Sequence, residues 1–267
     1  MGLAAAPAWA ATINWTNTSG GDWSVAANWS PNQVPGAADD AAISAAGTYT
    51  VTITADESVN TLTLGGASGA QTLNLSGGTF TLNAASTGNA QAVFNISGGT
   101  LAGAGALVLA GPLTWSGGTI SGVVQCNGGT FSGSPLLNGG QMVNRRTVSW
   151  TAGVMYTGSG SILSNAATGI INVTANFQEY PYGGTSAFNN AGQLNVAVPG
   201  TVTIIDAFTN TGTVAVTGGT LVLAGDHSLT GGTLNFGING LNNYGSNTLS
   251  GASALAGTLR ACLKKHE

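Results

Sequence analysis

The acidic residues whose spacing could support chemistry are Asp206 and Asp226, which lie 20 positions apart (226 − 206 = 20). If the chain repeats about every 20 residues, the two carboxylates occupy equivalent places on neighbouring repeats, about 4.8 Å apart. That distance is close to the roughly 5 Å between the two carboxylates of retaining glycosidases. Like charges at this distance also raise one pKa, which creates an acid and a base.

Four other side chains could complete such a site. Glu179 lies 27 positions before Asp206 (206 − 179 = 27) and could overhang the same wall as a third acid. Tyr180 and Tyr182 could stack against a sugar ring, and His227 could carry a proton. The structural alternative is that Asp226 and His227 are corner residues and that Asp206 ends a strand.

Other kinds of active site find no support in the sequence. It contains no nucleophile motif, no phosphate-binding glycine loop with a lysine, and no zinc-type spacing of Cys and His. We therefore expect neither a metal nor a cofactor.

The elements that must position these residues are short strands between glycine turns. Gly-Gly-Thr followed by an apolar residue begins at positions 77, 98, 117, 128, 218 and 231. Alternating runs such as Leu73–Leu75 accompany these turns, which is the period of half-buried strands. Phe188 and Phe208 begin similar segments 20 residues apart (208 − 188 = 20). The pattern predicts an all-β rod of about ten or eleven stacked coils, with apolar side chains inside and Thr and Asn ladders outside.

Charge is scarce along the whole chain. Charged residues make up 5% of the sequence, the net charge is −4, and the only charges between Glu57 and Glu179 are Arg145 and Arg146. The sequence has no basic stripe for nucleic acid and no apolar run near the roughly 20 residues that span a bilayer. We expect the two arginines at a solvated corner, with an anion contact as the alternative.

The composition divides the chain into four parts. Residues 1–11 resemble the remnant of a secretory signal peptide, with the small-x-small pattern Ala8-Trp9-Ala10, although an ordinary Ala-rich N-terminus is the alternative. Residues 12–64 form an N-terminal cap and the first coils, residues 65–240 form the solenoid, and residues 241–267 form the last coil and an atypical charged tail. Cys126 and Cys262 fall in coils too far apart to pair.

Tryptophans are concentrated near the start of the chain, where Trp15, Trp23 and Trp29 account for three of the six. Bulky indoles suit the cap that an open stack of coils requires, and a sugar-stacking platform is the alternative. Trp115 shares a strand face with Leu113, and Trp150 shares one with Val148, so we expect both tryptophans in the core.

The same N-terminal region carries a resemblance. The segment Trp15–Trp23 is followed by Asn28-Trp29, by Val34-Pro35-Gly36 and by Asp39-Asp40-Ala41. Together with the Gly-Gly-Thr repeats, this resembles the start of large bacterial secreted and cell-surface β-strand-repeat proteins, which include autotransporter-like passengers. The resemblance implies a single-stranded right-handed parallel β-helix and an adhesive or surface-coat role outside the cell.

Two functions follow as expectations. The first is a non-catalytic, adhesin-like protein, secreted or on the bacterial surface, that contacts a polysaccharide or cell-surface glycan through hydroxyl, amide and tyrosine side chains. The alternative is a glycoside hydrolase or polysaccharide lyase that uses Asp206, Asp226 and Glu179. An open C-terminal end would also permit end-to-end self-association.

Overall fold

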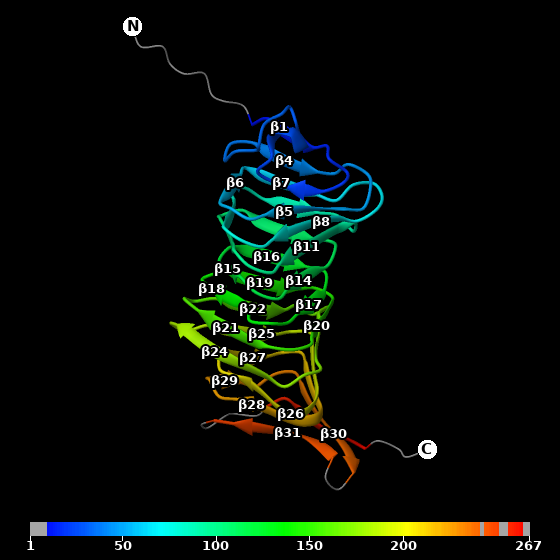
Figure 1. Ribbon diagram of the computed structural model, residues 1–267. Helices are drawn as coiled ribbons and strands as arrows, with labels where there is room; N and C mark the ends of the chain where they lie inside the picture. Colours follow the sequence, from blue (N-terminus) through cyan, green and yellow to red (C-terminus); the bar gives the residue numbers. More distant parts are fainter. Residues whose placement is uncertain (1–9, 241–242, 251–255, 264–267) are drawn as a thin grey trace.

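The computed structural model describes residues 10–240, 243–250 and 256–263. The chain winds as an all-β solenoid, and its helical structure within these residues is the 3₁₀ turn η1 (Ala26–Asn28). Figure 1 shows the coils stacked from β1 at the blue end of the rod to β30 and β31 at the orange end. The predicted parallel β-helix is therefore confirmed.

Two sheets run along the rod, one of 12 strands and one of 20 strands. The first sheet contains β1 (Thr12–Trp15), β3 (Trp29–Ser30), β4 (Asp40–Ile43), β7 (Thr61–Leu64), β10 (Ser86–Gly88), β13 (Ala106–Leu109), β16 (Val123–Cys126), β19 (Gln141–Asn144), β22 (Ile162–Asn165), β25 (Ala187–Asn190), β27 (Ala207–Asn210) and β29 (His227–Ser228).

The second sheet contains the other strands, and in most coils it takes two of them. They are β2 (Gly21–Asp22), β5 (Tyr49–Ile53), β6 (Glu57–Val59), β8 (Gln71–Leu75), β9 (Thr79–Leu82), β11 (Ala92–Ile96), β12 (Thr100–Ala102), β14 (Leu113–Trp115), β15 (Thr119–Ile120), β17 (Gly129–Phe131), β18 (Leu136–Asn138), β20 (Thr147–Trp150), β21 (Val154–Gly158), β23 (Ile170–Val173), β24 (Phe177–Gly183), β26 (Gln193–Ile204), β28 (Thr213–Leu223), β30 (Thr233–Gly240), β31 (Asn243–Leu249) and β32 (Thr258–Leu263).

Most coils therefore contribute three strands, one to the first sheet and two to the second. In the middle of the rod, β13, β14 and β15 form one coil and pair in parallel with β16, β17 and β18 of the next. Phe188 pairs with Phe208, so the 20-residue spacing read from the sequence is one full coil.

The core is a continuous apolar column inside the coils. Side chains alternate along each strand, so every second residue points inward. Trp115 and Trp150 are both buried, as predicted, and Phe131 lies between them with edge-to-face ring contacts of 5.5 Å and 5.7 Å. Such aromatic contacts add to the hydrophobic stabilisation of the stack.

The N-terminal end of the column is closed by Trp15, Trp23 and Trp29, all at most 2% exposed. The Trp29 ring meets Trp15 at 5.0 Å and Trp23 at 4.6 Å, and Trp29 Nε1 donates to the Trp23 carbonyl at 2.7 Å. The short strand β3 runs antiparallel to β1 and covers its free edge. The Trp-rich cap is thus confirmed.

The second glycine of the Gly-Gly-Thr repeat occupies the left-handed region at the start of a strand. Its φ is 65° at Gly78, 63° at Gly99 and 67° at Gly118. A Cβ on Gly118 would also lie 2.4 Å from the Gly98 carbonyl oxygen of the preceding coil. The repeat therefore reflects a corner that only glycine fits.

A second inner column is polar. Asn144, Asn165, Asn190 and Asn210 stack on successive coils and are at most 1% exposed. Each Nδ2 donates to the next Oδ1, at 2.9 Å, 2.8 Å and 2.8 Å along the column. Buried amides are satisfied by one another and by nearby carbonyls, so this asparagine ladder fixes the alignment of four coils.

Candidate functional site

β24 is an irregular segment of the wall. In the sequence, two tyrosines, a proline and an acid interrupt the repetitive pattern here, which predicts a loop that projects from the rod. That prediction is wrong, because the segment from Gln178 to Gly183 pairs with Val154 to Gly158 of β21. The register shifts between Thr157 and Gly158, and Pro181 and Tyr182 are exposed on the outside. The segment is a bulged strand.

Glu179 does not overhang the wall as predicted. It pairs with Met155 and points inward, with 0% exposure. Its Oε2 accepts hydrogen bonds from the backbone N–H groups of Ile205 at 2.9 Å and Asp206 at 3.3 Å. The first residues of β24 alternate between core and surface. Phe177 faces the core, so Glu179, two residues later, faces the core as well.

Asp206 also faces the interior and is 6% exposed. Its Oδ1 accepts a 2.7 Å hydrogen bond from the hydroxyl of Thr157, which is 49 residues earlier and two coils away. Backbones two coils apart are normally about 9–10 Å from each other. The bond forms where β24, the strand between them, shifts its register with β21 next to Thr157.

Burial shifts the pKa of both acids upward. Desolvation raises the pKa of Glu179 to about 8, and the nearby charge of Asp206 adds to the shift, while the two N–H donors oppose it. Burial also raises the pKa of Asp206, against the lowering effect of the Thr157 hydroxyl. Ionisation of either acid therefore disfavours ionisation of the other in this low-dielectric space.

The predicted stacking of Asp206 on Asp226 is wrong by one residue. His227 pairs with Phe208, so Asp226 lies beside Ala207. A one-residue shift turns a side chain to the opposite face of a strand, which leaves Asp206 inside and Asp226 exposed. The acid that accompanies Asp206 is instead Glu179.

A pocket of about 190 Å³ nevertheless brings Asp206 and Asp226 to one opening. Hydroxyl side chains of Thr157, Thr185 and Ser186 line it together with both carboxylates. His227 follows Asp226 in the sequence and is half-buried. Its Nδ1 lies 3.0 Å from the Gly225 carbonyl oxygen.

Tyr180 and Tyr182 are 41% and 59% exposed on the outer side of β24. The ring of Tyr180 stacks on Tyr156 of the preceding coil, with centroids 5.8 Å apart and an interplanar angle of 28°. The outward-facing tyrosines expected from the sequence are therefore present, and Tyr156 is a third member that sequence reasoning missed. We call these three residues the tyrosine platform.

The sequence predicted a larger polar surface only in general terms, as ladders of Thr and Asn on the outside of the rod. On the outer face of the second sheet, two parallel rows of hydroxyl and amide side chains cross seven successive coils, which we call the hydroxyl–amide array. The first row is Thr52, Asn74, Asn95, Thr114, Thr130, Ser149 and Asn172, and the second is Thr54, Ser76, Ser97, Ser116, Ser132, Thr151 and Thr174.

The sequence signal for the array is a repeated tripeptide with an apolar residue at its centre, such as Asn95-Ile96-Ser97 and Thr114-Trp115-Ser116. The central side chain is buried in the core while both polar side chains face outward. The array contains no charged residue. Arg145 and Arg146 lie apart from it, exposed beside an open hollow with Asn127, Thr147 and Thr168, which agrees with the predicted corner.

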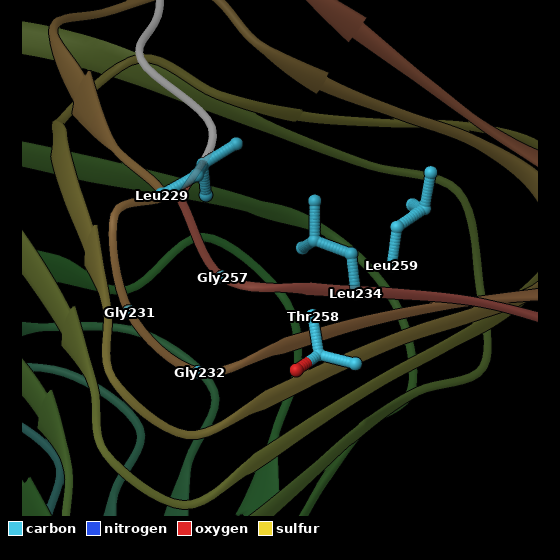
Figure 2. Close-up of a pocket in the computed structure, with 7 residues that line it drawn as sticks. All are labelled: Leu229, Gly231, Gly232, Leu234, Gly257, Thr258 and Leu259. Carbon is cyan, nitrogen blue, oxygen red and sulfur yellow. The ribbon is translucent and has the colours of Figure 1, made fainter.

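At the C-terminal end, β32 pairs with β30 and all six of its residues are exposed. Figure 2 shows a small hollow here, lined by Leu229, Leu234 and Leu259 together with the Gly231-Gly232 turn. Cys262 of β32 and the buried Cys126 are both free thiols, as predicted. End-to-end association through this edge stays a prediction, and the expected signal remnant and charged tail lie largely outside the described residues.

No family model matches this chain, and neither the curated proteins nor the solved structures include a match. Within the part of the chain that the structure describes, no helix is long and apolar enough to cross a membrane. Among the same residues, no group of three His, Cys, Asp or Glu side chains forms a ready-made metal site.

Proposed function

We propose that this protein is a non-catalytic, adhesin-like solenoid, secreted or displayed on a bacterial surface, that binds an uncharged polysaccharide. The observation that carries the proposal is the hydroxyl–amide array, which repeats the same pair of polar side chains on seven coils. Its regular strand spacing offers many hydrogen-bonding groups along one line, which suits an extended chain of hydroxylated units.

The chemistry of the surface also supports a neutral ligand. Charged residues are only 5% of the sequence and none belongs to the array. Few positive charges are therefore present to attract an anionic polymer. The tyrosine platform adds exposed aromatic faces with polar hydroxyl tips, which are suited to stack on a sugar ring. The resemblance of the N-terminal region to surface proteins supports the same role.

The decisive experiment is co-sedimentation of the intact chain with a panel of insoluble neutral polysaccharides, with cellulose and chitin among them. Thr130→Lys places a charge in the middle of the array, and Gln125→Lys places the same charge on the first sheet five residues earlier. We expect Thr130→Lys to weaken binding and Gln125→Lys to leave it unchanged. Equal effects of the two variants, or retention by none of the polysaccharides, would contradict the proposal.

The tyrosine platform is tested with Tyr180→Ala and Tyr182→Ala, each compared with its Phe variant. Tyr244→Ala serves as the control because Tyr244 is 54% exposed on β31, away from the platform. We expect about a tenfold loss of affinity for each Ala variant, since an aromatic contact residue commonly contributes more than 1 kcal/mol.

A polysaccharide-cleaving enzyme is the second candidate, favoured by the pocket that Asp206 and Asp226 share and by the raised pKa of Asp206. A carboxyl group whose pKa is raised by burial is better suited to act as a general acid. New reducing ends from the wild type, abolished in Asp206→Asn, would replace the binding proposal with this one.

A further inference from the structure

The pocket beside Asp206 is lined by two carboxylates and three hydroxyl side chains. We propose that Glu179, Asp206 and the hydroxyl groups of this pocket bind a hard divalent cation, with Ca²⁺ as the best match. The proposed site is independent of polysaccharide binding, because it lies inside the wall and not on the hydroxyl–amide array.

The first argument is that two buried carboxylate oxygens have no partner. Oε1 of Glu179 and Oδ2 of Asp206 make no hydrogen bond, although the two residues are 0% and 6% exposed. The other oxygen of each carboxylate is engaged, by Ile205 and Asp206 N–H groups and by Thr157. An unpaired oxygen on a buried anion is strongly unfavourable, so the pair requires a cation or a proton.

The second argument is that a polar pocket of sufficient size opens beside Asp206, although Glu179 is not among its lining residues. The pocket of about 190 Å³ is lined by Asp206, by the hydroxyls of Thr157, Thr185 and Ser186, and by Asp226 at its exposed edge. None of the lining residues is Lys or Arg. A volume of this size holds a cation together with several waters.

The donor set selects the kind of metal. Ca²⁺ accepts six to eight oxygen ligands in irregular geometry and often retains waters, whereas Mg²⁺ demands a near-ideal octahedron. Zinc sites in proteins rely mainly on Cys and His, and the lining of this pocket contains neither. Two carboxylates with hydroxyl and water oxygens therefore fit Ca²⁺ best.

The competing occupant is a proton shared by Glu179 and Asp206. The other titratable groups near the pocket are Asp226 and His227, both on the next coil. A proton and a cation compete for the same oxygens, so Ca²⁺ binding strengthens at higher pH, where the acids are ionised.

The test is a Ca²⁺ titration of the chelator-treated full chain at pH 8.5, by calorimetry and thermal unfolding, with Mg²⁺ and NaCl as controls. We expect saturable binding and a rise in Tm of roughly 5 °C at a hundredfold excess over the Kd. Glu179→Gln keeps the acceptor for the two N–H groups and removes one charge, and Asp206→Asn removes the other. Each should weaken binding at least about tenfold, because Ca²⁺ affinity depends on the charge of its ligands.

The matched control is Glu57→Gln, the same change at a half-buried glutamate in the first coils. It should leave the Ca²⁺ response unchanged. No saturable binding by the wild type, or an equal response in Glu179→Gln, Asp206→Asn and the wild type, would overturn the cation site. The pair would then share a proton only.

Discussion

Thr157 and Asp206 form a 2.7 Å hydrogen bond across an intervening coil, with 49 residues of chain between them. In a regular solenoid each side chain has its neighbours on the adjacent coils. This bond forms where the register between β24 and β21 shifts, next to Thr157. It links the interior of the rod to the pocket that Asp206 lines.

Removal of the Thr157 hydroxyl should destabilise the fold. Thr157→Val leaves Asp206 Oδ1 without a donor in a buried place, which costs about 1–3 kcal/mol. Urea unfolding of the wild type and the variant measures this loss. Thr157→Ser keeps the hydroxyl and should retain most of the stability, and equal losses in both variants would show that packing matters instead of the bond.

Stability should fall as pH rises between 5.5 and 8.5. Glu179 has a pKa of about 8 in the fold and 4.5 without it, so the folded chain holds a proton that the unfolded chain releases. Protonated Glu179 contributes its full stabilisation below the pKa of the unfolded chain. This contribution falls by roughly 3 kcal/mol as the pH rises from 5.5 through the pKa of the folded chain. The raised pKa of Asp206 acts in the same direction.

This dependence is measured by urea unfolding at several pH values in the presence of a chelator. Glu179→Gln cannot ionise, so its stability should change much less over this interval. A wild type that becomes more stable between pH 5.5 and 8.5 would contradict the assignment of a raised pKa to Glu179.

The asparagine ladder should be far less tolerant of substitution than the outer ladders. Asn165 Nδ2 bonds Asn190 Oδ1 and the Gln193 carbonyl, and its Oδ1 accepts from Asn144. Asn165→Ala leaves several buried polar groups unpaired, and we expect a loss of about 2–4 kcal/mol. Asn172→Ala, in the half-buried outer row, should cost under about 1 kcal/mol. Thermal unfolding of both variants gives the comparison.

Alanine substitutions at two glycines distinguish the cost of backbone strain from the cost of a steric clash. Gly118 and Gly160 have φ of 67° and 76°, but a Cβ on Gly118 meets the Gly98 carbonyl oxygen at 2.4 Å whereas nothing lies within 4 Å at Gly160. Gly160→Ala should cost about 1–2 kcal/mol from the left-handed conformation alone, and Gly118→Ala should cost more. If the two variants unfold at the same temperature, close contact between coils is not what requires glycine at the corner.

The sequence by itself determined the class of the fold, the length of one coil and the inward direction of the tryptophans. These follow from local rules: side chains alternate along a strand, and Gly-Gly-Thr marks a corner with positive φ. The hydroxyl–amide array also has a signal in the sequence, a tripeptide that recurs on successive coils. Recognising it as one surface required the register of strand pairing between the coils.

Only the tertiary structure decided which acids meet. A spacing of 20 residues suggested that Asp206 stacks on Asp226, but a coil that is one residue shorter at this point turns their side chains to opposite faces. Glu179 joins Asp206 because of the parity of β24 and the bulge that follows it. Register and bulges arise from pairing between distant segments, so the spacing of residues along the chain cannot determine them.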